Sequence, residues 1–473
     1  MESVAAALAR LQQLADGPEI SLLARVFADA GKELALVGGP VRDAFLGREV
    51  TDLDFTTDAT PDQILAIVTP VVDAHWDIGR EFGTIGARLG DATVEITTYR
   101  SDAYDGETRK PRVTFGSTLE DDLARRDFTI NAMALRLPEC VLVDPSGGVE
   151  DLLAGVLRTP GAPQTSFGDD PLRMMRGARF TAQLGFGLND AAMAAAVELA
   201  PTIDIVSRER VSDELRKLLL APGASNGIRV LVDTGIAERV LPEVPALRLE
   251  IDEHARHKDV YEHSLTALDR AMALERERGH QPNLVLRLAV LLHDIGKPAT
   301  RKIEPDGVVT FHHHDVLGGK LAAKRLRELR FDNDTVKAVA ELIRLHLRFF
   351  GYSEGQWSDA AVRRYVRDAG DLLEWLHILS RADVTTRNQR KAATLAAAYD
   401  DLEARIAVLA EEEELAAIRP DLDGEQIMAI LGLKPGRDVG EAYRFLMELR
   451  LDEGELGYDI ARNRLLEWWA SRG

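Results

Sequence analysis

Two acidic residues, Asp52 and Asp54, are separated by one position in a segment with the pattern of a short β-strand. Side chains two residues apart in a strand leave the same face, so both carboxylates would point into one site. Such oxygen atoms are the ligands that magnesium prefers, and two carboxylates with substrate phosphates suit a two-metal displacement. Glu95, in a neighbouring predicted strand, could complete the set. A pair of this kind on its own is more often a solvated strand end.

A Gly-Gly turn precedes these acids. Gly38 and Gly39 follow an apolar strand, and a helix is predicted to begin at about Pro40. Paired glycines let the backbone approach a ligand closely, and the free N–H groups at a helix N-terminus attract phosphate oxygens. Arg42 adds a forked cation beside the turn. A lone Gly-Gly pair is usually just a turn, but the turn and the two acids in this order are far more specific.

A second set of candidate ligands is rich in histidine. His263 lies in a predicted helix, and His293 and Asp294 are adjacent at the end of an apolar helix that residues 296–298 terminate. An ionisable pair after five apolar residues is costly to bury unless it is paired or binds a metal. Imidazole and carboxylate together suit Mn, Fe, Ni or Mg better than structural zinc. A single histidine on a helix is more often simply packed or exposed.

The elements that must position these residues form an α/β part and a helical part. Residues 1 to about 30 are predicted to form an amphipathic helix, and short strands are predicted at 34–37, 51–56, 84–89 and 94–99. From about residue 150 the strand signals fade, and apolar residues recur every three or four positions. With breaks at 241–245 and 411–420, the predicted domains are a head (1–149), a neck (150–245), a body (246–400) and a tail (401–473).

Composition and charge restrict the class of protein. The chain has 473 residues, of which 45% are hydrophobic and 29% charged, as in globular proteins of several domains. Its net charge of −20 excludes a generally basic nucleic-acid coat, so an RNA partner would be held by local patches of arginine. The single cysteine, Cys140, excludes an intramolecular disulfide and a Cys-based zinc cage, and favours the cytoplasm. No apolar stretch is long enough to span a membrane.

Five motifs in order carry a resemblance to a known family. GGPVRDAFLG (38–47) followed by D-x-D resembles motif A of class II tRNA nucleotidyltransferases and bacterial poly(A) polymerases, members of the polymerase-β superfamily. RRDFTINAMA (125–134) resembles motif B, and residues 147–159 resemble the hinge between head and neck. DDPLRMMRGARF (169–180) is similar to the base-reading E-D-x-x-R motif, with Asp169 where the family usually has Glu, and residues 208–219 resemble the last motif.

This resemblance implies a polymerase-β-like α/β head followed by an all-α neck, an HD-type body and a helical tail. It also implies addition of C, C and A to the 3′ end of tRNA from CTP and ATP, with release of pyrophosphate. The implied catalytic carboxylates, Asp52, Asp54 and Glu95, would act with Mg²⁺. The implied nucleotide-binding residues are Gly38, Gly39, Arg42, Arg126, Asp127, Asn131, Asp170, Arg173, Arg176 and Arg179.

The choice of base is assigned to Asp170 and Arg173. Because they are three residues apart, on a helix they would share one face and form a hydrogen-bonding edge for cytosine or, after a modest rotation, adenine. For Arg176 and Arg179, ion pairing with nearby acids is an alternative to phosphate binding. The polar segment 100–125, with Asp105, Arg109 and Lys110, resembles the family's flexible loop and favours full CCA addition. A poly(A) polymerase and a CC-adding enzyme remain alternatives.

The histidines carry a second resemblance. Their order, H then HD then D, resembles the HD-domain metal-dependent phosphohydrolases, which implies that His263, His293, Asp294 and Asp383 bind a divalent metal. His314 and His346 would hold a second ion or a substrate phosphate. An HD phosphohydrolase whose head only binds RNA is the alternative of another class, although the intact D-x-D argues against it. Basic runs at 320–348 and 363–391, and a helix-turn-helix in the tail, could contact RNA or be ordinary helix surface.

Overall fold

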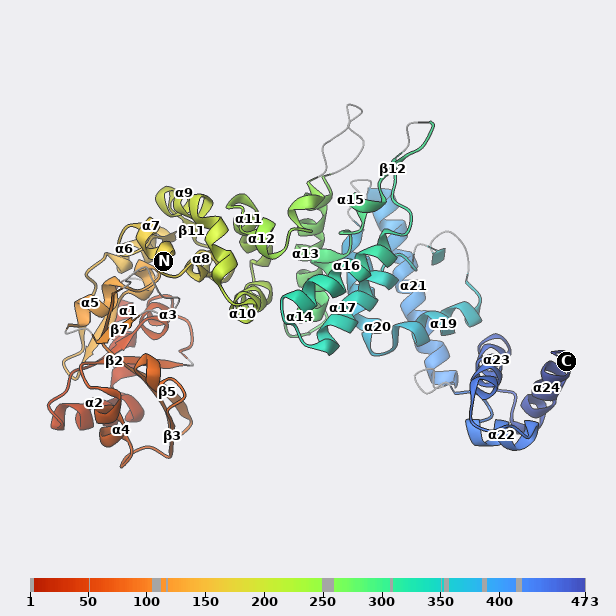
Figure 1. Ribbon diagram of the computed structural model, residues 1–473, viewed down its shortest axis with the longest axis horizontal. Coiled ribbons are helices and arrows are strands. Elements are labelled where there is room, and N and C mark those ends of the chain that lie inside the picture. Colours follow the sequence, from red (N-terminus) through yellow and green to blue (C-terminus); the bar gives the residue numbers. More distant parts are fainter. Residues whose placement is uncertain are drawn as a thin grey trace. The chain divides into compact units, whose positions relative to one another are not determined.

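The structure is a computed structural model that describes residues 4–50, 52–103, 112–115, 118–248, 259–306, 309–349, 351–352, 357–384, 389–413 and 419–472. The chain forms two compact units, Met1–Val240 and Leu241–Gly473, whose elements are labelled in Figure 1. In the described part of the chain, no helix combines the length and the apolar character that a membrane span needs.

A seven-stranded mixed sheet lies at the centre of the first unit. Its strands are β1 (Leu34–Val37), β2 (Leu53–Thr57), β3 (Ala74–Trp76), β4 (Thr84–Leu89), β5 (Ala92–Thr98), β8 (Ala134–Leu137) and β9 (Val141–Val143), in the order β3-β4-β5-β2-β1-β8-β9. Only β2 and β5 are parallel neighbours within this sheet. Their register places Asp54 opposite Glu95, so the sheet brings together two acids that are far apart in the sequence.

The N-terminal segment differs from the single predicted helix. It forms α1 (Val4–Ala15) and α2 (Pro18–Asp29), with Gly17 at the N-cap of α2. Proline cannot continue a helix but is well suited to its first position, so Pro18 ends one helix and begins the next. The other helices beside the sheet are α3 (Gly39–Phe45), α4 (Pro61–Val68) and the short η1 (Arg80–Phe82).

The segment predicted as a loop at 100–125 also contains regular structure. Strand β6 (Arg100–Ala103) pairs in antiparallel fashion with β7 (Arg112–Phe115), and α5 (Leu119–Ala124) follows. The Thr118 side chain accepts a hydrogen bond from the Asp121 N–H and so caps α5. The predicted loop residues Asp105, Arg109 and Lys110 lie outside the described residues.

The remainder of the first unit is mainly helical. After η2 (Thr129–Asn131) come α6 (Gly148–Ala154), α7 (Pro163–Asp169), α8 (Leu172–Leu184), α9 (Asp190–Leu199), η3 (Ala200–Ile205), α10 (Arg208–Leu220), α11 (Ala224–Asp233) and α12 (Ala237–Val240). Two short parallel strands, β10 (Val156–Leu157) and β11 (Gly187–Leu188), are the exception. Helices α10 and α11 pack against α8, and a Cβ at Gly227 of α11 would lie 2.8 Å from the Ala178 carbonyl oxygen.

The second unit is almost entirely helical. It contains η4 (Pro245–Leu247), α13 (Val260–Glu277), α14 (Leu284–Leu292), α15 (Lys297–Thr300), α16 (His314–Glu328), α17 (Asn333–Leu345), α19 (Asp359–Ala369), η5 (Gly370–Leu372), α20 (Leu373–Asp383) and α21 (Gln389–Glu413), with a small hairpin of β12 (Lys302–Ile303) and β13 (Val309–Thr310). Helix α14 ends before His293, and its residues from Leu286 onward are buried. A Cβ at Gly296 would lie 2.1 Å from the His314 carbonyl oxygen, so glycine permits the close approach of α16.

The tail folds around its own small core. Helices α22 (Gly424–Leu431), α23 (Arg437–Glu453) and α24 (Tyr458–Ala470) bury a cluster that includes Ile427, Leu446 and Leu465. The rings of Phe445 and Trp468 stack with their centroids 4.7 Å apart. The helix-turn-helix predicted in this region corresponds to α22 and α23.

Candidate functional site

An open cleft of about 570 Å³ in the first unit brings together the residues that the sequence assigned to catalysis and nucleotide binding. It is lined by Gly38, Gly39, Arg42, Asp52, Asp54, Glu95, Arg126, Asp127, Asn131, Asp170, Arg173, Arg176 and Arg179. The cleft therefore combines five carboxylates, of which Asp52, Asp54 and Glu95 lie at the sheet, with a concentration of guanidinium groups. This combination suits a ligand that carries both phosphates and metal ions.

The carboxylates lie at the sheet. Asp54 belongs to β2, Asp52 directly precedes this strand, and Glu95 is on β5. Burial, together with the charges of Glu95 and Asp52 and against the opposing effect of Arg126, raises the pKa of Asp54 to about 6. Within the described residues, the three acids do not form a group with ligand atoms within 4.8 Å of one another. A divalent cation would relieve the mutual repulsion of these acids. Binding of Mg²⁺ by Asp52, Asp54 and Glu95 stays a prediction.

The glycine turn lies beside two arginines. Gly38 has φ +77°, a conformation that favours glycine, and a Cβ there would lie 3.4 Å from Nη1 of Arg126. Arg42, on α3, donates from Nη1 to Oδ1 of Asn131 at 2.8 Å and forms two bonds of 2.9 Å with Asp43. The turn, Arg42 and Asn131 are thus held together at one wall of the cleft.

Asp127 organises its neighbours from a buried position. Its Oδ1 accepts hydrogen bonds from the Phe128 N–H at 2.8 Å and from Asn131 Nδ2 at 3.1 Å, and its Oδ2 lies 2.7 Å from Nη2 of Arg176. Burial opposes ionisation of Asp127, but Arg176 and these hydrogen bonds outweigh it and lower the pKa. Arg176 thus forms the ion pair that was the alternative to phosphate binding. Arg179 likewise donates from Nε to Glu214 at 2.6 Å.

The expectation that Asp170 and Arg173 share a helix face is wrong. Asp170 has an extended backbone after α7, and Pro171 precedes α8, on which Arg173 lies. Helical backbone angles are unfavourable for a residue that precedes proline, which explains why Asp170 does not join α7 to α8. Oδ2 of Asp170 accepts a bond of 2.9 Å from Arg210 on α10, which the sequence did not reveal. Arg173 donates to Ser166 Oγ at 2.8 Å and to the Arg125 carbonyl at 2.7 Å.

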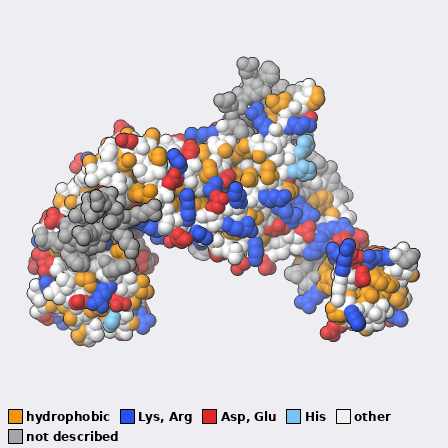
Figure 2. All heavy atoms as spheres, in the orientation of Figure 1, with side chains coloured by type: hydrophobic (Ala, Val, Ile, Leu, Met, Phe, Trp, Pro, Cys, Tyr) orange, Lys and Arg blue, Asp and Glu red, His pale blue; other side chains and the backbone are white. Residues whose placement is uncertain are grey.

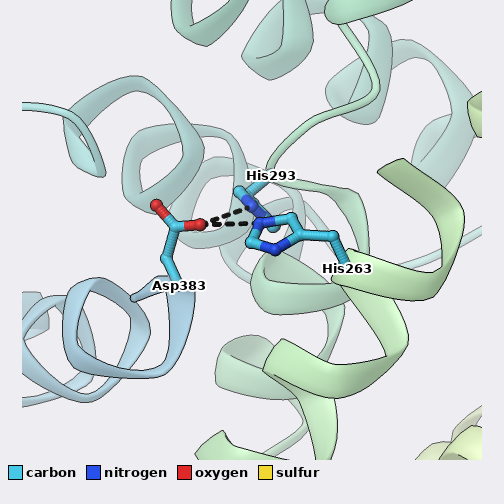
Figure 3. Close-up of side chains that lie close together, drawn as sticks. All are labelled: His263, His293 and Asp383. Carbon is cyan, nitrogen blue, oxygen red and sulfur yellow. Dashed lines mark hydrogen bonds and ion pairs between the residues drawn. The ribbon is translucent and has the colours of Figure 1, made fainter. Parts of the chain in front are cut away.

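A cluster of histidines and acids forms a second candidate site, in the second unit. His263 on α13, His293 directly after α14 and Asp383 at the end of α20 have ligand atoms within 4.8 Å of one another. In Figure 3 both imidazole rings turn toward one oxygen of Asp383. Oδ1 of Asp383 lies 2.8 Å from Nε2 of His263 and 3.3 Å from Nε2 of His293.

Asp294 connects this group to a second one. The structure groups Asp294 with His314 and His346, again within 4.8 Å. Its Oδ2 is 3.3 Å from Nε2 of His293, whereas its Oδ1 is 3.4 Å from Nε2 of His314. The two carboxylate oxygens thus face different groups, and Oδ2 also accepts a bond of 2.6 Å from Nζ of Lys297.

The histidine rings have the orientation that metal ligation needs. Nδ1 of His293, His314 and His346 each lies within 2.6–2.8 Å of a backbone carbonyl, which favours a proton on Nδ1 and leaves Nε2 to bind a metal. These Nε2 atoms are buried and have no hydrogen-bond partner among the described residues. Burial lowers the pKa of His293, but Asp294 and Asp383 outweigh it and raise the pKa to about 10, so a metal would displace a proton there. The residues present therefore fit a divalent metal.

Three family models match successive parts of the chain. Models of a "Poly A polymerase head domain", a "Probable RNA and SrmB- binding site of polymerase A" and an "HD domain" match residues 34–158, 185–247 and 260–410. The A-adding tRNA nucleotidyltransferase of Deinococcus radiodurans is 35% identical over 444 residues, which cover 92% of this chain and 95% of that protein. The chain belongs to the tRNA nucleotidyltransferase family. The family predicted from the motifs is thereby confirmed.

Two further proteins define the likeness. The CC-adding tRNA nucleotidyltransferase of Thermus thermophilus is 32% identical over 93% of this chain and 95% of its own length. The crystal structure of the Bacillus stearothermophilus CCA-adding enzyme in complex with CTP superimposes with a TM-score of 0.67 at 24% identity, over 96% of this chain and 99% of that one. This likeness confirms the predicted fold class: a polymerase-β-like head, a helical neck and an HD body.

In this tRNA nucleotidyltransferase, further side chains line the cleft that the sequence did not single out. They are Arg100, Arg125, Phe180 and Lys217, together with apolar and threonine side chains of the strands. Arg125, Phe180 and Lys217 lie within the family motifs, so these motifs marked the right segments but not these residues. Phe180 lies under cations, because the guanidinium carbon of Arg179 is 4.2 Å from its ring centroid.

The basic runs of this tRNA nucleotidyltransferase are largely paired with acids. Arg325 bonds to Glu243 at 3.0 Å, and Arg364 bonds to Glu448 at 3.1 Å. Arg344 pairs with Glu341, and Arg348 pairs with Asp368. Figure 2 shows blue and red side chains interspersed on the visible face of the second unit. Arg387 lies outside the described residues. RNA contact by these runs stays a hypothesis.

Proposed function

We propose that this protein adds C, C and A to the 3′ end of tRNA from CTP and ATP. In each step the terminal 3′-oxygen of the RNA bonds to the α-phosphorus of the nucleotide, and the bond to pyrophosphate breaks. The observation that supports this most is the cleft, because every residue implied by the head and base-reading motifs lines it. Family membership supports the same reaction class.

The residues of the cleft would divide the work. Asp52, Asp54 and Glu95 would hold Mg²⁺, which supplies charge neutralisation for the phosphates. Arg42 and Arg126, beside the glycine turn, would bind the triphosphate, with Asp127 and Asn131 orienting the ribose and the neighbouring cations. The base-reading pair is Asp170 and Arg173, whose carboxylate accepts and whose guanidinium donates. Arg176 and Arg179 would exchange part of their present pairing for phosphate oxygens.

We assign the head to residues 1–149, the neck to 150–245, the body to 246–400 and the tail to 401–473. In this division the tail helices and the basic runs would contact the tRNA, and the protein would act in the cytoplasm. Solved structures of this fold include CCA-adding enzymes in complex with tRNA, with CTP and with ATP, which supports these three as the ligands here.

The number of nucleotides added must be tested directly. Relatives similar over more than 90% of the chain are an A-adding and a CC-adding enzyme. Purified protein should therefore be given tRNA that ends before the first C, or after both, with labelled CTP and ATP singly and together. We expect both RNAs to be completed to CCA, with one A. Product ending at CC, extension of only the CC-ended tRNA, or long A tails would each replace the proposal with a different activity.

A second activity, metal-dependent phosphohydrolysis of RNA ends, is proposed for the body. It is favoured by two groups of possible ligands, His263 with His293 and Asp383, and Asp294 with His314 and His346. The Nε2 atoms of His293, His314 and His346 are buried and have no hydrogen-bond partner among the described residues. Mn, Fe, Ni or Mg would be the metal. Hydrolysis of 2′,3′-cyclic phosphates should be assayed with each metal in turn. Asp52→Ala should abolish nucleotide incorporation and retain hydrolysis, and His293→Ala should do the reverse; joint loss in either variant would contradict two separate sites.

A further inference from the structure

Asp122 is a fully buried carboxylate that none of the roles proposed above uses. It lies on α5, has 0% relative exposure, and is surrounded by donors. Oδ1 accepts from the Arg125 side chain at 2.7 and 3.1 Å and from the Arg100 N–H at 3.3 Å. Oδ2 accepts from Nη2 of Arg126 at 3.0 Å and from Oγ1 of Thr56 at 3.3 Å.

The partners of Asp122 either line the cleft or lie on the strand that carries Asp54. Thr56 is two residues after Asp54 on β2, so the two side chains leave the same face of the sheet. Arg100, Arg125 and Arg126 all line the cleft. Asp122 thus ties the catalytic strand to both ends of the segment that carries the β6–β7 hairpin.

The charge of Asp122 is maintained in spite of its burial. Burial alone would raise its pKa, but Arg126 and Arg125 outweigh this effect and lower the pKa. Removal of one partner from a buried ion pair is costly, and a guanidinium without a fixed partner keeps many rotamers. Asp122 therefore restricts where the Arg126 guanidinium can lie.

Arg126 occupies a position where orientation matters. Its Nη1 lies 3.4 Å from the position of a Cβ on Gly38, and its charge acts on Asp54. Its Nε is buried and has no hydrogen-bond partner among the described residues. The bond to Asp122 uses Nη2 and leaves the rest of the guanidinium edge for a ligand.

We propose that Asp122 is a positioning residue that holds Arg126 in the orientation in which it binds the triphosphate of the incoming nucleotide. This inference rests on the proposed function, because it takes Arg126 as a triphosphate ligand. Asp122 does not touch the nucleotide itself. Its substitution should therefore weaken triphosphate binding more than it slows the chemical step.

The test is the isosteric substitution Asp122→Asn in the full-length protein. The KM for CTP should rise about tenfold, with kcat changed much less, because a charged hydrogen bond that orients Arg126 is weakened. Product inhibition by pyrophosphate should weaken in parallel, since pyrophosphate reports the triphosphate subsite alone. Glu275→Gln is the matched control: Glu275 is also 0% exposed and pairs with an arginine, Arg287, but lies in the other unit. That control should leave the KM for CTP unchanged.

A double-mutant cycle separates positioning from a merely structural role. In the Arg126→Ala background, Asp122→Asn should no longer raise the KM for CTP, because the residue through which it acts is gone. If the two effects instead multiply, or if folded Asp122→Asn has the wild-type KM, the proposal is overturned. Should Asp122→Asn fail to fold, Asp122→Glu keeps the charge but moves the carboxylate by one methylene, and a wild-type KM in that variant would be equally contrary.

Wild-type behaviour distinguishes this inference from the function on which it rests. A wild-type protein that incorporates no nucleotide refutes the proposed function, and the role of Asp122 falls with it. A wild-type protein that completes CCA while the Asp122 variants keep a normal KM refutes only the role of Asp122.

Discussion

Asp54 lies directly opposite Glu95 in the parallel pairing of β2 with β5. Because these strands come from distant parts of the sequence, the pairing creates a concentration of negative charge that neither segment has alone. Burial, with the charges of Glu95 and Asp52, raises the pKa of Asp54 to about 6. The head thus holds a carboxylate whose ionised form is unfavourable until a cation is bound.

Asp54→Asn should stabilise the metal-free protein at pH 7.5 and abolish nucleotide incorporation. The pKa of Asp54 is higher in the folded state, about 6, than its ordinary value of 3.8, so the ionised group opposes folding above pH 6. This penalty disappears as the pH falls through about 6 toward 4. Thermal unfolding of both proteins should be measured from pH 4 to 8 without metal. At neutral pH the free energy of unfolding of Asp54→Asn should exceed that of the wild type by up to about 3 kcal/mol. The exposed Asp91→Asn serves as control; equal stabilisation there would remove Asp54 from the explanation.

The affinity for divalent metal should fall as the medium becomes more acidic than about pH 6. Protons compete with the metal for Asp54, so binding of Mn²⁺ to the head should release a proton in this range. The body metal site must be removed first with His293→Ala, so that only the head is measured. Calorimetric titration in buffers of different ionisation enthalpy measures the released protons. Binding independent of pH between 4.5 and 7.5 would contradict Asp54 as a ligand.

Asp170→Ala should relax the choice of base. The carboxylate accepts hydrogen bonds that cytosine and adenine can donate, so its loss removes the penalty that uracil and guanine otherwise incur. The ratio of kcat/KM for CTP to that for UTP should fall by about ten- to a hundredfold. Asp213→Ala, an exposed acid on α10, should leave the ratio unchanged. An unchanged ratio in Asp170→Ala would assign base selection to other residues.

His314→Ala should lower the metal content of the body and its hydrolase activity but leave nucleotide addition intact. Nε2 of His314 is buried and lies 3.4 Å from Oδ1 of Asp294, on the side away from His293. Its neighbour His312 is exposed, so His312→Ala controls for the loss of a histidine at the same helix start. Metal analysis of the purified variants gives the comparison. Equal metal content in the two variants would refute His314 as a ligand.

The second unit should lose stability between pH 6.5 and 4 because of His377. Burial lowers the pKa of His377 to about 4, whereas in the unfolded chain it is near 6.5. Below pH 6.5 the unfolded chain therefore takes up a proton that the folded chain refuses. His377→Phe, which keeps a ring against Tyr365, should reduce this loss by at most about 1.4 kcal/mol per pH unit. Urea unfolding at several pH values measures it, and an unchanged slope would contradict the explanation.

The sequence predicted the elements that carry the cleft better than the contacts within it. Strands β1 and β4 begin and end at the predicted residues, because alternation and turn signals are local. The prediction of a single N-terminal helix was wrong at Gly17 and Pro18, although glycine and proline commonly mark the ends of helices. The predicted helix through Asp170 was wrong for the same reason, because Pro171 interrupts the helix that would have joined Asp170 to Arg173.

Contacts that depend on tertiary structure could not be predicted. The motifs marked Arg126, but no spacing rule indicates that Asp122 accepts a hydrogen bond from it. Nor does one indicate that Thr56, on β2, donates to the same oxygen of Asp122. Likewise, the histidine motif grouped Asp294 with His263, whereas the helix arrangement turns its two oxygens toward different groups. Such relationships follow from how strands and helices meet, which a single sequence does not state.

The most direct test of the account is incorporation of labelled nucleotides into tRNA that lacks its 3′ CCA, with wild-type protein and with Asp52→Ala. Wild-type protein with CTP, ATP and Mg²⁺ should add three nucleotides that end in one A, and Asp52→Ala should add none. Incorporation at the wild-type rate by folded Asp52→Ala, or no incorporation by the wild-type protein, would contradict it.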